Sequence, residues 1–541
     1  MKKILQSGDL FLWFTGAALG TIILLVSGLL FIVGLNGAGV FWPSNLALVQ
    51  YADGRQWLGE IGSEEIIPQS NLPENLRGDD HTRFQMKIGN RDVYGVDFKW
   101  INDYELTELR YPENAIALER REYGNLYGFL ESIKESDRII VQGEEALTTF
   151  ESLLEKSNDV FEQRTRLEKS EVGAVNFQIE QLRLTIKKLE YEGGHAADEI
   201  TAIQNSIQTL QRQYETLRES IDELNSKTAS TYVVFKIADG STKEIPISKI
   251  IRFYKPNQMN GIEKLQYYAA KIWEFLADDP RESNTEGGVF PAIFGTVMMV
   301  LIMTLVVVPF GVMAAVYLRE YAKQGVLVRL IRIAVNNLAG VPSIVFGIFG
   351  LGFFVYVCGG TIDQLFYPER LPSPTWGTGG ILWASLTLSL LTIPVVIVAT
   401  EEAISAVPKG VRDGSMALGA TKWQTTWRVV LPASTPGILT GVILSMARGA
   451  GEVAPLMITG VVKLAPNLPI DQIWPFVHLD RKFMHLGFHI YDVGFQSPNV
   501  EAAKPMVFMT ALLLIAIVLL LNLTAIIIRA RLRKKYQSSA F

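Results

Sequence analysis

The sequence has a single cysteine, Cys358, among 541 residues. One thiol cannot build a disulfide framework or a zinc or iron–sulfur site with several cysteine ligands. Charged residues make up only 19% of the chain, and the formal net charge of −5 argues against a nucleic-acid binder. No Gly-x4-Gly-Lys-Ser/Thr motif occurs, so no P-loop is expected to bind ATP.

The charges that are present are unevenly distributed. Residues 51–289 carry 43 acidic and 29 basic side chains, whereas the rest of the chain carries 12 and 21. An acidic block is therefore inserted into a basic, apolar remainder. Uncharged runs cover residues 10–35, 287–318, 333–362, 371–400 and 505–528, and a run at 429–462 is interrupted only by Arg448 and Glu452.

These six runs predict six membrane spans, because about 20 apolar helical residues cross a bilayer core. The run at 10–35 is too long for the core of a signal peptide and no small-residue cleavage site follows promptly, so we interpret it as a retained anchor. Lysine and arginine gather before the first run, between the second and third, between the fourth and fifth, and after the sixth. By the positive-inside rule, segments 1–9 and 533–541 are cytoplasmic and residues 36–286 lie outside.

The external block is predicted to be α+β with an antiparallel coiled-coil hairpin at about 150–226. Apolar residues recur every three or four positions in two stretches, separated by Gly193-Gly194. The alternative is that each stripe packs on a globular core. Strands are expected at Phe84–Ile88, Val93–Trp100, Thr231–Ile237 and Ser241–Ile247. No catalytic constellation is evident there. The apolar positions are Val175, Ile179, Leu182, Ile186 and Leu189, then Ile200, Ile203, Ile207, Leu210, Tyr214, Leu217, Ile221 and Leu224.

Residues 401–434 are predicted to form a sharp helix–turn–helix. Small residues at Gly414, Ala417, Gly419 and Ala420 permit a tight turn with close backbone approach. Trp423 and Trp427 are four residues apart on one helix face, which suits a groove on another protein. Pro432, after Leu431, is expected to end the second helix and lead into the fifth span.

Residues 401–434, here called the coupling segment, resemble the coupling loop of ABC-importer permeases, whose Glu-Ala-Ala-x-x-x-Gly motif corresponds to Asp413–Gly419 here. The resemblance covers residues 287–532 and includes four motifs in order. Together they resemble the phosphate importer family, in particular the A-type (PstA) permease. The four stretches are GGVFPAI at 287–293, LAGVPSIV at 338–345, TEEA at 400–403 and ARGAGEVAPL at 447–456.

This resemblance implies a multi-pass permease of the bacterial inner membrane with a large periplasmic domain and a transmembrane domain at 287–532. It implies phosphate as substrate, a second related permease, a cytoplasmic ATPase dimer and a periplasmic phosphate-binding protein as partners, and no cofactor or ATPase motif of its own. The coupling residues carried over are Glu402, Asp413, Gly414, Ala417, Gly419, Ala420, Trp423, Leu431 and Pro432. Glu401 and Glu402 are expected either to contact Arg412 or Lys409, or to form an exposed acidic pair.

Two features depart from the family pattern. About 250 residues separate the first two spans, where the family usually has a short segment, and Val398 occupies a position where the family often has an arginine. Val398 leaves open another oxyanion, such as phosphonate or sulfate. A periplasmic sensor or scaffold that uses the coiled coil is the alternative from a different class.

Arg448 and Glu452 are expected one helical turn apart within the fifth span. A charge near the bilayer centre costs roughly 2.5–3.5 kcal/mol, so pairing is favourable. Either Arg448 faces the pathway and meets a phosphate oxyanion while Glu452 positions it, or the two form a structural ion pair. His478, His485 and His489 cluster without a cysteine, and we interpret them as solvated or packing residues rather than a metal site.

Overall fold

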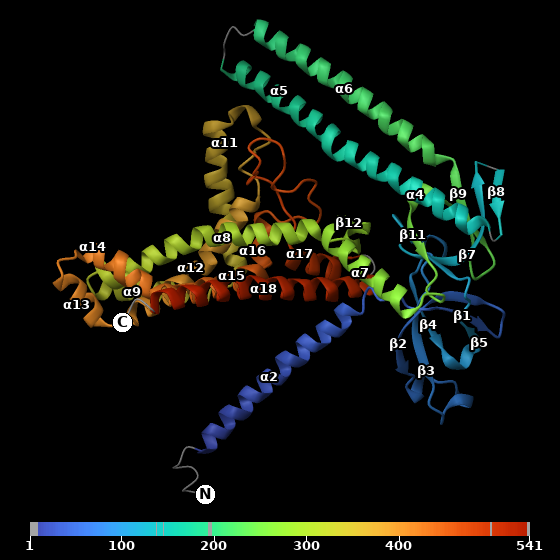
Figure 1. Ribbon diagram of the computed structural model, residues 1–541, viewed down its shortest axis with the longest axis horizontal. Coiled ribbons are helices and arrows are strands. Elements are labelled where there is room, and N and C mark those ends of the chain that lie inside the picture. The colour runs from blue at the N-terminus through green and yellow to red at the C-terminus, as the bar shows by residue number, and fades with distance from the viewer. Residues whose placement is uncertain (1–8, 137, 144, 193–196, 498–499, 538–541) are drawn as a thin grey trace. The chain divides into compact units, whose positions relative to one another are not determined.

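The computed structural model describes residues 9–136, 138–143, 145–192, 197–497 and 500–537 (Figure 1). The chain forms two compact units. Unit 1 consists of residues 1–40, 289–367 and 371–541, and unit 2 of residues 41–288 and 368–370. Most of the expected N-terminal segment 1–9, the end of the tail 533–541 and the expected turn at Gly193-Gly194 lie outside the described residues.

Unit 1 is helical. Among the described residues, six helices are long and apolar enough to cross a membrane, as the sequence predicted. Three of the six are composite, because a wider π-helical segment, labelled η, joins two helical stretches or extends one. The spans are Leu12–Ala38, Phe290–Tyr321, Ser343–Phe366, Ile381–Ser405, Lys422–Gly451 and Val500–Leu532.

The spans are built from helices that Figure 1 labels, with shorter elements between them. The elements of unit 1 are α2 (Asp9–Ala38), α8 (Phe290–Val316), η7 (Tyr317–Tyr321), α9 (Val326–Leu338), α10 (Ser343–Phe349), η8 (Gly350–Gly359), α11 (Gly360–Phe366), α12 (Ile381–Ser405), α13 (Lys409–Ala417), α14 (Lys422–Thr425), η10 (Thr426–Val430), α15 (Leu431–Gly451), α16 (Ala454–Thr459), α17 (Leu486–Tyr491), η11 (Asp492–Gln496) and α18 (Val500–Gln537).

Helix α12 forms the centre of unit 1, packing against both α8 and α15. Its buried Leu388 and Leu391 share one apolar core with Met299 and Met303 of α8. The buried hydroxyl of Ser385 donates to the carbonyl of Ile381, 2.7 Å away in the same helix. Hydroxyls satisfied in this way let α12 carry polar side chains at a tight helix–helix contact.

The third span starts later than its uncharged run suggested. Helix α9 ends at Leu338 and the span begins at Ser343, after Pro342. The absence of charge over 333–362 marked an apolar stretch, but Pro342 cannot donate the backbone hydrogen bond that a continuous helix requires. Helix α9 is therefore a separate short amphipathic helix.

Helix α2 contacts α18, but most of its side chains are exposed. None of the most apolar 18-residue window of this span is buried. Near its end, Gly37 approaches α18 so closely that an added Cβ atom would lie 3.0 Å from the carbonyl oxygen of Phe508 and 3.1 Å from Leu512. The first span thus contacts α18 near residue 37, and Figure 1 shows the rest of α2 diverging from α18.

The described residues of unit 2 form two large antiparallel sheets and a short two-stranded one. The first has the order β4-β3-β2-β1-β5, and the second has the order β10-β9-β7-β6-β11, with β8 paired to β7. The strands are β1 (Leu46–Tyr51), β2 (Gln56–Ile66), β3 (Thr82–Lys87), β4 (Phe98–Asn102), β5 (Leu106–Arg110), β6 (Ile116–Arg120), β7 (Leu126–Glu135), β8 (Arg138–Gln142), β9 (Thr231–Lys236), β10 (Thr242–Pro246) and β11 (Ile250–Tyr254), with a short pair β12 (Pro280–Arg281) and β13 (Glu286–Gly287).

The strand expected at Val93–Trp100 is wrong in its first half. Residues Arg91–Tyr94 form a helical turn, α3, and Gly95 follows with φ +73°. The strand β4 starts only at Phe98. Alternating apolar residues indicated a strand, but the left-handed glycine ends the turn and delays it.

Two long helical stretches of unit 2 extend from its second sheet and return to it. The first comprises α4 (Glu145–Arg166), η4 (Leu167–Val172) and α5 (Gly173–Tyr191), and the second is α6 (Ala197–Ala229). Figure 1 shows α5 and α6 side by side, and they are in contact. Phe150 of α4 stacks on Phe253 with 4.5 Å between ring centroids, which fixes the base of this helix on the second sheet.

Buried charges hold helix α7 (Gly261–Ala277) against the second sheet. Glu119 of β6 lies 3.0 Å from Lys271 Nζ and 3.1 Å from Arg252 Nε, and it also accepts a hydrogen bond from the hydroxyl of Tyr267. Lys271 is also 3.1 Å from Glu274. Burial raises the pKa of Glu119, but Lys271 and Arg252 outweigh it and leave that pKa below its ordinary value.

Candidate functional site

The coupling segment follows directly from the central helix α12. After α12 ends at Ser405, α13 carries Asp413, Gly414 and Ala417, and α14 begins at Lys422. The expected helix–turn–helix is therefore present in the structure as α13, a turn at 418–421, and α14. Thr421 starts α14 by accepting a hydrogen bond from the backbone N–H of Gln424, whose side chain accepts one from Thr421 in return.

Gly414 and Gly419 play different structural roles. Gly419 has φ +87° and follows the end of α13, the position where a left-handed residue commonly terminates a helix. Within 4 Å of a Cβ atom added at Gly414 or Gly419, no atom is found. In this chain the turn therefore requires backbone freedom at Gly419, and close approach is not the reason for glycine at either position.

Exposed apolar side chains mark one surface of the coupling segment. The rings of Trp423 and Trp427 stack with 5.6 Å between centroids and an interplanar angle of 17°. Trp423 is 60% exposed, Trp427 is 58% exposed, and Leu418 at the turn is 92% exposed. Such a surface is typical of a protein contact or a membrane interface.

Pro432 does not end the second helix, contrary to the expectation from the sequence. Helix α14 continues through η10 into α15, so residues 422–451 form one span. The N–H of Leu431 bonds to the carbonyl of Thr426, five residues back, which widens the helix immediately before the proline. This wide turn accommodates the ring, so α14 is joined to the fifth span without a break.

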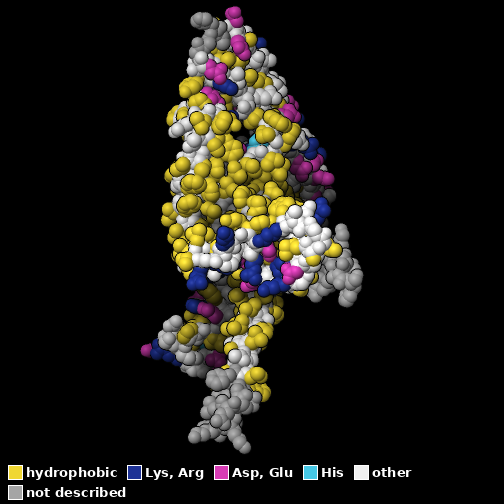
Figure 2. Space-filling model, turned by 90° about the vertical axis from the view of Figure 1, so that its left-hand side faces the viewer, with side chains coloured by type: hydrophobic (Ala, Val, Ile, Leu, Met, Phe, Trp, Pro, Cys, Tyr) yellow, Lys and Arg dark blue, Asp and Glu magenta, His cyan; other side chains and the backbone are white. Residues whose placement is uncertain are grey.

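Basic side chains surround the coupling segment. Figure 2 shows lysine and arginine gathered over the end of unit 1 that carries α13 and α14, with hydrophobic side chains covering much of the surface above them.

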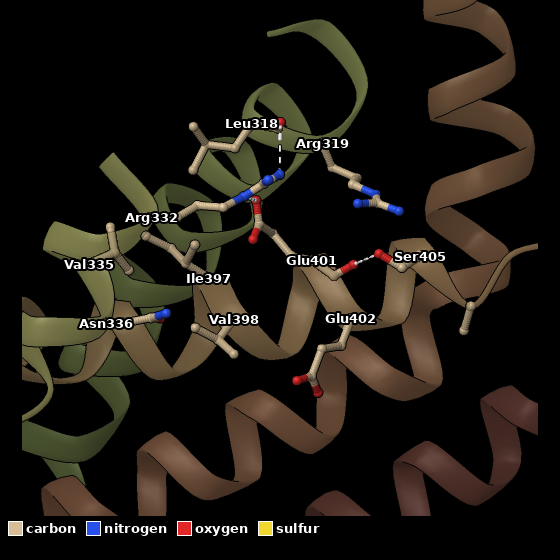
Figure 3. Close-up of a pocket in the computed structure, with 11 residues that line it drawn as sticks. Leu318, Arg319, Arg332, Val335, Asn336, Ile397, Val398, Glu401, Glu402 and Ser405 are labelled. Atoms are coloured by element: carbon tan, nitrogen blue, oxygen red, sulfur yellow. Dashed lines mark hydrogen bonds and ion pairs between the residues drawn. The ribbon is translucent and has the colours of Figure 1, made fainter. Parts of the chain in front are cut away.

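A pocket of about 570 Å³ lies between η7, α9 and α12 at this end (Figure 3). Arg332 Nε is 3.2 Å from Glu401 Oε1, and its Nη1 donates to Gln324 Oε1 at 3.0 Å. Val398 lines the same pocket as Arg332 and Arg319. The lining residues are Leu318, Arg319, Arg332, Val335, Asn336, Ile397, Val398, Glu401, Glu402, Ser405 and Ala406.

In the described part of the chain, Glu401 does not pair with Arg412 or Lys409, the partners expected for it and Glu402. Glu401 pairs with Arg332 of α9, whereas Arg412 pairs with Glu320 of η7 at 3.2 Å. Glu402 points away from the Arg332–Glu401 pair in Figure 3, and it is exposed.

Sequence reasoning missed the ion pairs Arg332–Glu401 and Arg412–Glu320. The available signal was a group of cations and carboxylates at the ends of spans. The partners are far apart in the chain, so no local spacing identifies which charges meet.

Arg448 and Glu452 lie at a break between two helices. Helix α15 ends at Gly451, and Glu452 has an extended backbone with φ −79° and ψ 136°. The expectation that both residues lie on one helix is therefore wrong, because the helix ends at Gly449-Ala450-Gly451. Arg448 Nε is nonetheless 3.7 Å from Glu452 Oε1, and both side chains are partly exposed.

The three histidines lie in separate environments. His478 contacts Asp471 at 2.9 Å, His485 accepts a hydrogen bond from the N–H of Gly487 at 3.1 Å, and His489 contacts Thr510 at 3.3 Å. Burial lowers the pKa of His485 to about 3, so this imidazole stays neutral. Among the described residues, no group of three potential metal ligands is present.

Comparison with known proteins places these helices in a transporter family. Residues 307–537 match the family described as "Binding-protein-dependent transport system inner membrane component". The "Probable ABC transporter permease protein YqgI" of Bacillus subtilis is 31% identical over 251 residues, which cover 45% of this chain and 77% of that protein. The "Phosphate transport system permease protein PstA" of Yersinia pestis is 33% identical over 257 residues, 48% of this chain and 77% of that protein.

Other similarities cover less or are weaker. The "Phosphate transport system permease protein PstA" of Mycobacterium leprae is 39% identical over 172 residues, 32% of this chain and 51% of that protein. A solved structure of the MetNI methionine ABC transporter covers 44% of this chain and 94% of its own, at 18% identity and a TM-score of 0.33, which carries no further inference. On the sequence similarity, the chain belongs to the inner-membrane permeases of ABC importers and, among them, to the PstA-like permeases.

Proposed function

We propose that this chain is the permease subunit of an ATP-driven phosphate importer and forms half of its translocation pathway. The observation that carries the proposal is the 33% identity to a phosphate permease over 257 residues. Permeases of this family work with a second permease, ATPase subunits and a substrate-binding protein. ATP would be hydrolysed on the separate ATPase dimer, and phosphate delivered by a binding protein outside the membrane.

The coupling segment is the proposed contact with the ATPase. Its turn presents Leu418, and its second helix presents the stacked Trp423 and Trp427, all of them exposed in the isolated chain. The basic side chains around α13 and α14 support a cytoplasmic location for this end. With six spans, both termini are then cytoplasmic. Asp413, Gly414, Ala417, Gly419, Ala420 and Glu402 belong to the same proposed contact, and Leu431 and Pro432 connect it to α15.

Arg448 and Glu452 are the proposed pathway residues. A guanidinium offers paired N–H donors that match phosphate oxygens. Glu452, 3.7 Å from Arg448, holds the guanidinium in place and offsets its charge when no anion is bound. The helix break after Gly451 places this pair where backbone groups are no longer committed to a helix.

Unit 2 is the proposed periplasmic domain, with α5 and α6 as a coiled-coil hairpin. Apolar residues at three- and four-residue spacing on both helices, which are in contact, support this reading. Its role is to dock an envelope partner or to brace the assembled transporter.

The test is ATP-dependent uptake of labelled phosphate by proteoliposomes that contain this chain, its second permease, the ATPase and the binding protein. Unlabelled phosphate, sulfate and methylphosphonate serve as competitors. Uptake blocked only by phosphate supports the proposal. Uptake of sulfate or methylphosphonate in place of phosphate would agree with a permease but contradict phosphate as its substrate. Val398 leaves that result open.

A further inference from the structure

One arginine of the coupling helix α13 reaches two different spans. The guanidinium of Arg412 donates to the carbonyl of Val407 at 2.7 Å and to that of Ile404 at 2.5 Å. Its Nη2 atom also lies 3.2 Å from Glu320 Oε1. Arg412 thus joins α13 to the end of α12 and to η7, which continues α8.

The contacts at the end of α12 satisfy a local requirement. The last carbonyl groups of a helix have no intrahelical partner, and they form the negative end of the helix dipole. Arg412 supplies donors and a positive charge there. The link to α12 therefore does not depend on any side chain of α12.

The contact with Glu320 joins α13 to the neighbouring span. The Arg412 side chain is 17% exposed and that of Glu320 is 14% exposed. Ion pairs with so little exposure are screened less by solvent than surface pairs. Helix α8 packs along the central helix α12, so the pair acts at the end of the most extensively packed pair of spans.

A second contact reaches the same short segment. Lys422 Nζ of α14 lies 5.1 Å from the ring centroid of Tyr321, the residue after Glu320. The coupling segment is therefore attached to η7 at two adjacent residues, in addition to its covalent links to α12 and α15.

We propose that Arg412, through Glu320, is the positioning residue that transmits movement of α13 to α8 and α12. This inference rests on the proposed function, because it assumes that an ATPase moves α13. Helix α15 follows α14 by helical continuity, whereas α8 has no such link. Without the Arg412–Glu320 pair, only the Lys422–Tyr321 contact and the packing of α8 on α12 would carry the movement to α8, and ATP hydrolysis would proceed with less transport.

The test compares the assembled transporter with Glu320→Gln, Arg412→Lys and the double variant in proteoliposomes. Glu320→Gln removes the charge and preserves the shape of the side chain. Arg412→Lys keeps the charge but loses the planar fork that reaches carbonyl and carboxylate together. Lys323→Gln, an exposed charge change near Glu320, is the control.

The measured quantities are phosphate imported per ATP hydrolysed and stimulation of ATP hydrolysis by the binding protein. In Glu320→Gln we expect the phosphate imported per ATP hydrolysed to fall about fivefold, which corresponds to a loss of about 1 kcal/mol. Basal ATP hydrolysis should be retained. The double variant should be no worse than Arg412→Lys alone, because both changes break one contact. If Arg412→Lys fails to accumulate, Glu320→Gln decides alone, because it removes no cap of α12.

Unchanged import per ATP and unchanged stimulation in Glu320→Gln would overturn the inference. Additive losses in the double variant would also overturn it. If the wild-type complex hydrolyses ATP but imports no phosphate, the proposed substrate fails, and stimulation by the binding protein still decides the role of Arg412.

Discussion

A Cβ atom added to Gly441 of α15 would lie 2.5 Å from the Cβ atom of Ala399 of α12. One turn earlier in α15, an added Cβ at Gly437 would meet the Cβ of Ala403 at the same distance. The two helices therefore pack through small residues, as helices in membranes commonly do. This contact aligns the span that follows the coupling segment with the central helix.

Gly441→Val should weaken this contact by about 1–3 kcal/mol, because the added methyl groups force α12 and α15 apart. The measurement is the Tm of the detergent-solubilised chain. Gly352→Val is the matched control, because no atom lies within 4 Å of a Cβ atom added there. Equal Tm values for the two variants would contradict the tight packing.

Gly419→Val should uncouple transport from ATP hydrolysis while the subunit still reaches the membrane. A non-glycine residue at φ +87° is strained by about 1–2 kcal/mol, so the turn between α13 and α14 would change its shape. Phosphate import and ATP hydrolysis are measured in parallel, with membrane content from immunoblots.

Gly414→Ala is the comparison that distinguishes backbone strain from steric crowding as the reason for glycine at position 419. Gly414 lies within α13 and has open space around an added Cβ atom, so the structure of the turn should be retained in this variant. A Gly414→Ala chain that lost thermal stability as much as Gly419→Val would show that positive φ is not the reason for Gly419.

Acid should destabilise unit 2 through Glu119 and Glu274. Lys271 and Arg252 outweigh burial and hold both pKa values below their ordinary range. A carboxyl group with a lowered pKa stabilises the folded state above the pKa of the unfolded chain, about 4.3. That stability is lost as the pH falls from about 4.3 through the lowered values.

Glu119→Gln should reduce the free energy of unfolding at pH 7 by about 3 kcal/mol, because Lys271 and Arg252 lose a buried partner. It should also flatten the loss of stability below pH 5. The measurement is thermal unfolding of the full chain in detergent at several pH values. A wild-type Tm that does not fall in acid would contradict the assignment.

The sequence predicted the spans well because uncharged apolar runs of this length rarely occur outside membrane-spanning helices. It did not predict their ends, because absence of charge cannot distinguish helix from the break at 339–342. Glu452 shows the same limit. Its spacing from Arg448 suggested one helix, but Gly451 ends α15, and the contact forms across the break.

The chemistry around the coupling segment was harder to predict. Proline often ends a helix, but the π-helical turn at Thr426–Val430 accommodates Pro432 within a continuous span. The partners of Arg412 and Glu401 are set by how α8, α9 and α12 pack. Local patterns do not contain that information, whereas they do contain the turn at Gly419.

The most direct test of the proposed function is labelled phosphate uptake by the reconstituted complex carrying Arg448→Gln. The account predicts that the variant assembles and hydrolyses ATP but that phosphate uptake falls to background, with partial uptake in Arg448→Lys, which keeps the charge without the fork. Uptake by Arg448→Gln at the wild-type rate would contradict the assignment of Arg448 to the phosphate pathway.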